Sequence, residues 1–91
     1  MINTTDPVYI VKLVNIYDIY NNEYIIGVAS SREHAIEIIK SHIKGVDCSY
    51  KYHKFLTERW LLNERLCGGT TETFTKEQNI EWAKELGVYH D

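Results

Sequence analysis

The hydrophobic and polar positions of this chain follow a strand pattern near its start. From Val8 to Tyr17 most residues are β-branched or aromatic, and both alternating faces are apolar. Such a strand lies in the middle of a sheet or is covered on both sides. A second strand-like run, Tyr24 to Ala29, follows a short link that contains Asn21-Asn22, a pair that tolerates positive φ. The two runs therefore predict an antiparallel β-hairpin.

The pattern changes to a helix period after this hairpin. Ser30 and Glu33 have the spacing of a capping box, and Gly45 is a natural C-cap. Between them, one set of residues falls within an arc of roughly 160° at 100° per residue. This set consists of Ala35, Ile36, Ile38, Ile39, His42 and Ile43. We predict a helix here that packs on the core with this stripe.

The segment from Tyr52 to Arg65 fits a helix better than a strand. Strand alternation fails at Phe55-Leu56 and again at residues 60–62. A helical projection places six large residues on one face: Tyr52, Phe55, Leu56, Trp60, Leu62 and Leu66. We predict a helix that ends before Gly68-Gly69. The threonine-rich segment 70–74 fits either a short edge strand or a loop.

A second capping box, Thr75-Lys76-Glu77-Gln78, begins a last helix that Gly87 ends. Its apolar face carries Ile80, Trp82, Ala83 and Leu86. The predicted fold class is therefore α+β. It consists of an N-terminal antiparallel hairpin, alone or extended to a three-stranded sheet, packed by two or three helices.

The length of 91 residues fits one domain spanning residues 1–91, in which residues 1–6 form a flexible tail. A two-stranded sheet alone is marginal in water, so the apolar first strand needs a third strand, helices or a second copy of the chain. A homodimer is therefore predicted as one of these three ways to cover the strand. The polar start and the absence of a long apolar run predict a cytoplasmic protein, in which Cys48 and Cys67 stay reduced.

The charge balance argues against a typical nucleic-acid-binding protein. The chain has ten basic and 13 acidic residues, which gives a net charge of −3. Proteins that bind nucleic acids usually carry an excess of Lys and Arg. One basic segment leaves that function open as an alternative. It carries Lys51, Lys54, Arg59 and Arg65.

The sequence contains no recognisable catalytic motif: there is no phosphate-binding loop, no glycine-flanked nucleophilic serine and no His-Glu-x-x-His helix. His42, Cys48, His53 and Cys67 are residue types that bind zinc, but no two of them form a tight Cys-x-x-Cys pair. Cys67 falls at the end of a predicted helix, where the helix dipole raises the pKa of a thiol and makes it a poor nucleophile. We predict no metal, no cofactor and no enzymatic activity.

Two groups of residues are candidates for contact with a protein partner. Tyr17, Tyr20 and Tyr24 surround the hairpin turn, where amphipathic side chains either recognise a partner or cover sheet edges. Glu77, Glu81 and Glu85 recur every four residues on the last helix. Like charges at this spacing repel slightly, so the stripe is either a solvated face or a surface for a basic partner.

The run from Gly27 to Ala35, Gly-Val-Ala-Ser-Ser-Arg-Glu-His-Ala, carries a family resemblance. It resembles small phage and prophage proteins that open with a hairpin and a Gly-Val-x-Ser-Ser-x-Glu-x-Ala turn into a helix. The resemblance covers the first half of the chain, implies an accessory phage protein rather than an enzyme, and transfers no functional residues. We therefore expect a small protein-binding protein that modulates or inhibits a host protein.

Overall fold

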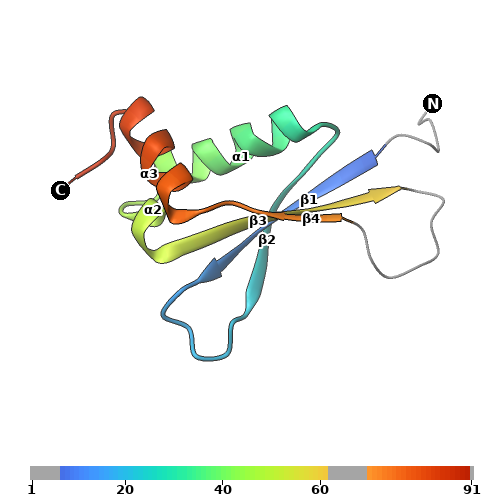
Figure 1. Ribbon diagram of the computed structural model, residues 1–91, viewed down its shortest axis with the longest axis horizontal. Helices are drawn as coiled ribbons and strands as arrows, with labels where there is room; N and C mark the ends of the chain where they lie inside the picture. Colours follow the sequence, from blue (N-terminus) through green and yellow to red (C-terminus); the bar gives the residue numbers. More distant parts are fainter. Residues whose placement is uncertain (1–6, 62–69, 91) are drawn as a thin grey trace.

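The chain forms a four-stranded antiparallel sheet with helices packed on one of its faces, an α+β fold (Figure 1). The structure is a computed structural model that describes residues 7–61 and 70–90. The elements in chain order are β1 (Pro7–Asn15), β2 (Glu23–Ala29), α1 (Arg32–Gly45), α2 (Ser49–Tyr52), β3 (His53–Leu61), β4 (Thr70–Thr73) and α3 (Lys76–Glu85). The predicted tail, residues 1–6, lies outside the described residues.

Strand β1 occupies the middle of the sheet, whose order is β2-β1-β3-β4. This position explains why both of its faces are apolar, and the β1–β2 hairpin is present as the sequence predicts. Asn21 in the connecting link has a φ of 53°. The register shifts so that Val11 pairs with Gly27 but Lys12 pairs with Ile25. One residue of β2 is therefore extra, a bulge that increases the local twist.

The helix predicted from Tyr52 to Arg65 is wrong, because residues 53–61 form strand β3. This strand pairs along the whole of β1, from Pro7 opposite Leu61 to Asn15 opposite His53. Its residues 55–57 are all buried, so the adjacent Phe55 and Leu56 fill the two faces of a central strand. Arg65 lies outside the described residues. The threonine segment is edge strand β4, the first of the two alternatives.

Both long helices begin with a hydroxyl N-cap, as predicted, but in α1 the capping residue is one position later than predicted. Ser31 and not Ser30 caps α1, because Ser31 has extended backbone and its hydroxyl accepts a hydrogen bond from the His34 N–H. The C-cap of α1 is Val46 and not Gly45, since the helix continues through Gly45. Thr75 caps α3 by accepting from the Gln78 N–H, as predicted.

The core lies between the sheet and the helices. Its buried members are Val11, Leu13, Ala29, Ala35, Ile39, Ile43, Tyr50, Phe55, Phe74, Trp82 and Ala83. Strand β3 and the helices thus supply, within one chain, the support that the apolar first strand needs. The homodimer stays a prediction, and the fold does not depend on it. None of the helices in residues 7–61 and 70–90 is long and apolar enough to cross a membrane.

Candidate functional site

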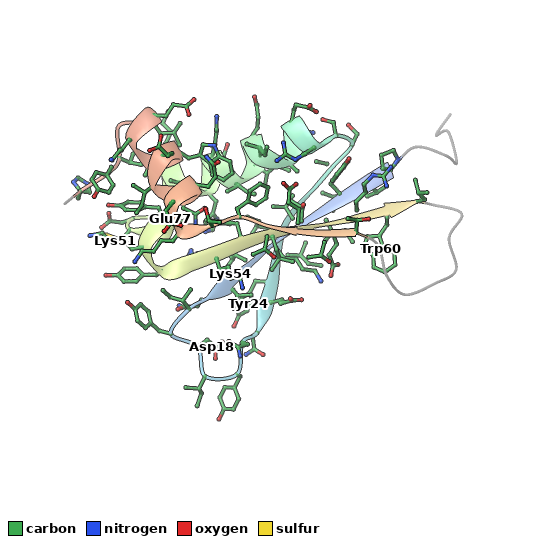
Figure 2. The ribbon with its side chains drawn as sticks, in the orientation of Figure 1. Asp18, Tyr24, Lys51, Lys54, Trp60 and Glu77 are labelled. Carbon is green, nitrogen blue, oxygen red and sulfur yellow. The ribbon has the colours of Figure 1, made fainter. Side chains whose placement is uncertain are left out.

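The link between β1 and β2 projects from the sheet on the side away from the helices, where Asp18 and Tyr24 are labelled (Figure 2). All three tyrosines predicted there are exposed: Tyr17 by 70%, Tyr20 by 77% and Tyr24 by 51%. The sequence reasoning missed three isoleucines beside them. We call the six residues the tip surface: Ile16, Tyr17, Ile19, Tyr20, Tyr24 and Ile25, of which Ile19 is the most exposed at 81%.

Hydrogen bonds fix the shape of this link. The side-chain oxygen of Asn15 accepts from the Tyr17 N–H at 2.9 Å, and that of Asp18 accepts from the Tyr20 N–H at 2.9 Å. These are successive Asx turns, a local alternative to sheet pairing. The Ile16 N–H donates to the carbonyl of Tyr52 at 2.9 Å. The tip surface is therefore held in one shape, which lowers the entropy cost of binding.

A fourth tyrosine extends the tip surface towards β3. The ring of Tyr52 lies 5.5 Å from the ring of Tyr17, centroid to centroid, at a tilt of 55°. Tyr52 is 42% exposed, and it is the last residue of α2. Aromatic pairs with this geometry contribute about 0.5–1.5 kcal/mol beyond their buried area. The pair orients Tyr17 while leaving most of its ring accessible.

The acidic stripe of α3 lies apart from the tip surface. Glu77, Glu81 and Glu85 are all exposed, and Glu85 pairs with Lys40 of α1 at 3.3 Å. Figure 2 shows Glu77 on the helix side of the molecule, well away from Tyr24 and Asp18. The two groups of candidate partner-binding residues therefore form two separate surfaces.

The basic segment is divided because its central part is a strand rather than a helix. Lys54 and Arg59 are five residues apart in β3, so their side chains point to opposite faces of the sheet. Lys51 lies on α2, and Arg65 lies outside the described residues. The four candidates for nucleic-acid contact do not form one described surface.

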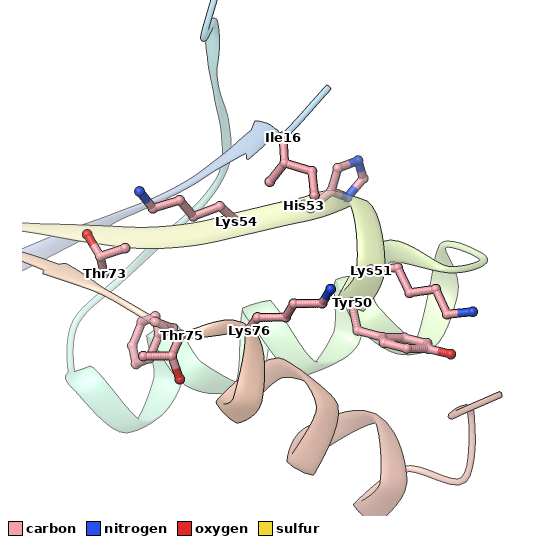
Figure 3. A pocket seen from close by; sticks show the side chains of 9 residues that line it. Ile16, Tyr50, Lys51, His53, Lys54, Thr73, Thr75 and Lys76 are labelled. Atoms are coloured by element: carbon pink, nitrogen blue, oxygen red, sulfur yellow. The ribbon is translucent and has the colours of Figure 1, made fainter. Parts of the chain in front are cut away.

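A pocket of about 420 Å³ lies where β3 begins, β4 ends and α3 begins (Figure 3). We call it the lysine pocket. Its lining residues are Ile16, Tyr50, Lys51, His53, Lys54, Thr73, Phe74, Thr75 and Lys76. Ile16 belongs to both the pocket and the tip surface. Sequence reasoning missed the pocket because its walls come from distant parts of the chain, and one of them was expected to be a helix.

Two histidines meet beneath the pocket. The His42 and His53 rings lie 5.4 Å apart, centroid to centroid. Burial lowers the pKa of both side chains below the ordinary value of 6.5, and the proximity of His53 lowers the pKa of His42 further. His42 Nε2 is buried and has no hydrogen-bond partner among residues 7–61 and 70–90. Both pKa shifts favour the neutral form of the imidazole rings.

The structure brings together two of the four metal-ligand candidates, His42 and His53. Cys48 is a half-buried free thiol, and Cys67 lies outside the described residues. Within residues 7–61 and 70–90, no group of three His, Cys, Asp or Glu side chains is arranged to hold a metal ion.

Ser49 and His53 have the spacing of a nucleophile and its base. The Ser49 hydroxyl oxygen lies 2.8 Å from His53 Nδ1. However, Ser49 is 0% exposed, so a substrate cannot reach its hydroxyl without opening the fold. This hydrogen bond fixes the orientation of the imidazole at the pocket wall.

Comparisons with family models, with curated proteins and with solved structures find no match for this chain. Its function is therefore inferred from its own surfaces. Two of them stand out in the part of the chain that the structure describes: the tip surface and the lysine pocket beside it.

Proposed function

We propose that this protein is a non-catalytic protein-binding module that holds its partner with the tip surface. The observation that carries the proposal is the exposure, by 47–81%, of six large apolar or aromatic residues at one end of one hairpin. Tyr24 and Ile25 are consecutive in β2 and therefore point to opposite faces of the sheet, so the exposed apolar residues surround the end of the hairpin. Large exposed apolar residues that gather at one place are typical of interaction sites. Tyrosine is also enriched at protein interfaces, because its ring is apolar and its hydroxyl bonds to polar groups.

The fixed shape of the tip favours a partner with a complementary apolar groove. Tyr17, Ile19 and Tyr20 would insert into this groove, while Asp18 and the asparagines at its rim stay hydrated. Glu77 and Glu81 would contribute if the partner extends as far as α3 with a basic surface. If the chain is phage-encoded, as its hairpin and helix start suggest, the partner is a host protein in the host cytoplasm, which this protein modulates or inhibits.

The experiment is affinity capture from bacterial lysate with three tagged proteins. The first is the parent chain, and the second is a tip variant with Tyr17→Ser, Ile19→Ser and Tyr20→Ser. The third is a control, Val46→Ser, which removes an apolar residue exposed by 41% elsewhere on the surface. We expect a host protein that the parent and the control capture and the tip variant loses. Identical capture by all three proteins would refute the assignment of the tip.

One double variant separates the contribution of the acidic stripe. Glu77→Lys/Glu81→Lys reverses two charges that make no ion pair with another described residue. Loss of the same captured protein would place α3 in the interface. Unchanged capture would leave the tip surface as the contact and the stripe as a solvated face.

The alternative function, nucleic-acid binding, is favoured by one observation: Lys51, Lys54 and Lys76 gather around a single pocket. Phosphate contacts release counterions, so such binding would weaken steeply with salt. A gel shift with single- and double-stranded DNA and RNA at low salt tests it. A shift that disappears in Lys51→Gln/Lys54→Gln would support this function, and no shift at all would exclude it.

A further inference from the structure

The lysine pocket is lined by one sign of charge. Three lysines and no carboxylate line it, although the chain as a whole carries a net charge of −3. None of these lysines forms an ion pair with a described residue. In contrast, Glu23, Glu58, Glu72 and Glu85 all pair with basic residues elsewhere.

The three lysines come from three different elements. Lys54 lies on β3, Lys51 on α2 and Lys76 at the first position of α3. Figure 3 shows Lys54 and Lys76 on opposite walls, with the side chain of Lys76 extended towards Tyr50. In the same view the amino group of Lys54 lies at the Thr73 end of the pocket and that of Lys76 at the Tyr50 end, so an anion between the walls would draw both side chains towards it. Lysine ammonium groups are mobile point charges, so they can close on a small anionic group without a fixed geometry.

The backbone adds to this positive potential at one wall. Thr75 and Lys76 line the pocket at the start of α3, a helix of ten residues. The first N–H groups of a helix carry a partial positive charge that favours anions. Glu77, in the same turn, opposes this potential, but it is not among the lining residues and its side chain is exposed to solvent.

The rest of the lining is apolar. Phe74 and Tyr50 are buried core residues, and Ile16 closes the side next to the tip surface. The volume of about 420 Å³ falls within the range of small-molecule sites, which combine apolar walls with a few polar groups. A purely polar anion such as phosphate would leave these apolar walls unused, and a neutral hydrophobe would gain nothing from the positive charge of the three lysines, two of which are exposed to solvent.

We propose that the lysine pocket binds a small amphipathic anion, whose apolar body packs on Ile16, Tyr50 and Phe74 while its carboxylate lies between Lys54 and Lys76. This site shares Ile16 with the tip surface, but it uses neither Ile19 nor Tyr20, so ligand binding here does not require the partner-binding function of the tip. The ligand class follows from the juxtaposition of apolar walls and three lysines without an acidic partner.

The test uses sodium octanoate as the probe and octan-1-ol, which has the same chain length without the charge, as its control. The readout is the set of backbone amide signals of ¹⁵N-labelled protein during titration. We expect octanoate to shift the signals of His53, Lys54, Thr73 and Lys76 in a saturable way. Octan-1-ol should bind at least fivefold more weakly.

Three variants complete the experiment, and the same spectra show that each one is folded. Lys54→Gln/Lys76→Gln removes two charges at nearly constant size and should weaken octanoate at least fivefold. Lys44→Gln, at an exposed lysine in the last turn of α1, should change nothing. Ile19→Ser/Tyr20→Ser removes tip residues that do not line the pocket, and octanoate binding should survive it.

The inference is overturned by the absence of saturable shifts at the pocket, by equal affinity for octan-1-ol, or by unchanged affinity in the double lysine variant. These outcomes are distinct from failure of the proposed function, which is measured by capture with the tip variant and does not involve octanoate.

Discussion

Gly27 provides the sharpest test of the packing between α1 and the sheet. A methyl group placed on its Cα would lie 2.9 Å from Cδ1 and 2.9 Å from Cγ2 of Ile38. Carbon atoms in ordinary contact are about 3.5–4.0 Å apart, so the overlap is roughly 0.6–1.1 Å at each atom. Cγ2 is attached directly to Cβ and cannot move by a terminal rotation alone. Gly27→Ala therefore requires a change of the Ile38 rotamer or a displacement of α1.

The free energy of this substitution contains two opposing terms. Overpacking of a core typically costs about 1–3 kcal/mol. Replacing a strand glycine by alanine returns about 0.5–1 kcal/mol, because the unfolded chain loses freedom. Gly27 lacks the positive φ that Gly87 has, so alanine fits its backbone without strain. We expect a net loss of about 0.5–2 kcal/mol, and a lowering of the Tm by several degrees for a domain of this size.

Ile38→Ala should reverse the sign of the effect. This second substitution removes all three Ile38 atoms that the methyl group would meet. In the Ile38→Ala background, Gly27→Ala should stabilise the protein by about 0.5 kcal/mol. Gly45→Ala is the matched control, since nothing lies within 4 Å of its added methyl group.

Urea unfolding of the four proteins of this cycle measures the coupling, which we expect to be about 1–2.5 kcal/mol. If Gly27→Ala costs the same with and without the Ile38 side chain, close approach of α1 to β2 is not the reason for a glycine at this position.

Three further predictions concern a buried hydroxyl, two histidines and the oligomeric state. Tyr50→Phe removes the two hydrogen bonds that the Tyr50 hydroxyl makes with the N–H (2.7 Å) and the carbonyl (3.1 Å) of His90. We expect the free energy of unfolding to fall by about 1–2 kcal/mol and amide exchange at residues 88–90 to become faster. Unchanged exchange at these residues would contradict the prediction. Because burial lowers the pKa of His42 and His53, the unfolded chain binds protons at a higher pH than the folded one, so stability should decline as the pH falls below about 6.5. Thermal melts between pH 7.5 and 5.5 measure this pH dependence of stability. His42→Leu, which also removes a nitrogen without a partner among the described residues, should make the pH dependence less steep. An equally steep profile in that variant would exclude His42 as the source of the pH dependence. For the expected homodimer, sedimentation equilibrium should show a dimer that dissociates on dilution without loss of secondary structure, whereas a monomer at every concentration would end that expectation.

The sequence was sufficient for those elements whose signals are local. The hairpin, α1 and α3 each carry a periodic apolar pattern and a cap or turn residue within a few positions, such as Thr75 and Asn21. Strand β3 carries no such signal, because burial on both faces at Phe55 and Leu56 removes the alternation that identifies a strand. Its identity is decided by pairing with β1, more than 35 residues earlier in the chain. That long-range pairing outweighs a local pattern that also fits a helix.

The candidate site residues also divide into those that a local sequence signal predicts and those that depend on the folded structure. Tyr17, Tyr20 and Tyr24 could be predicted from their place around a turn, since turns lie at the surface. Ile16 and Ile19 could not, because an isolated isoleucine in a sequence is by default a core residue. The lysine pocket needs Lys54 and Lys76 on facing walls, and their proximity exists only once β3 and β4 pair and α3 follows.

The position of the tip relative to the helices explains why its apolar residues stay exposed. The core of the described chain is formed where α1 packs on β1 and β2, α2 packs on β3, and α3 packs against α1 and α2. The hairpin link projects beyond this layer (Figure 1). Ile19 and Tyr20 therefore have no helix against which to pack, and replacing them with serine should change the free energy of unfolding by less than about 0.5 kcal/mol. The fold does not need these residues, whose link is shaped by hydrogen bonds to the side chains of Asn15 and Asp18, and they are the residues that the proposed partner would cover.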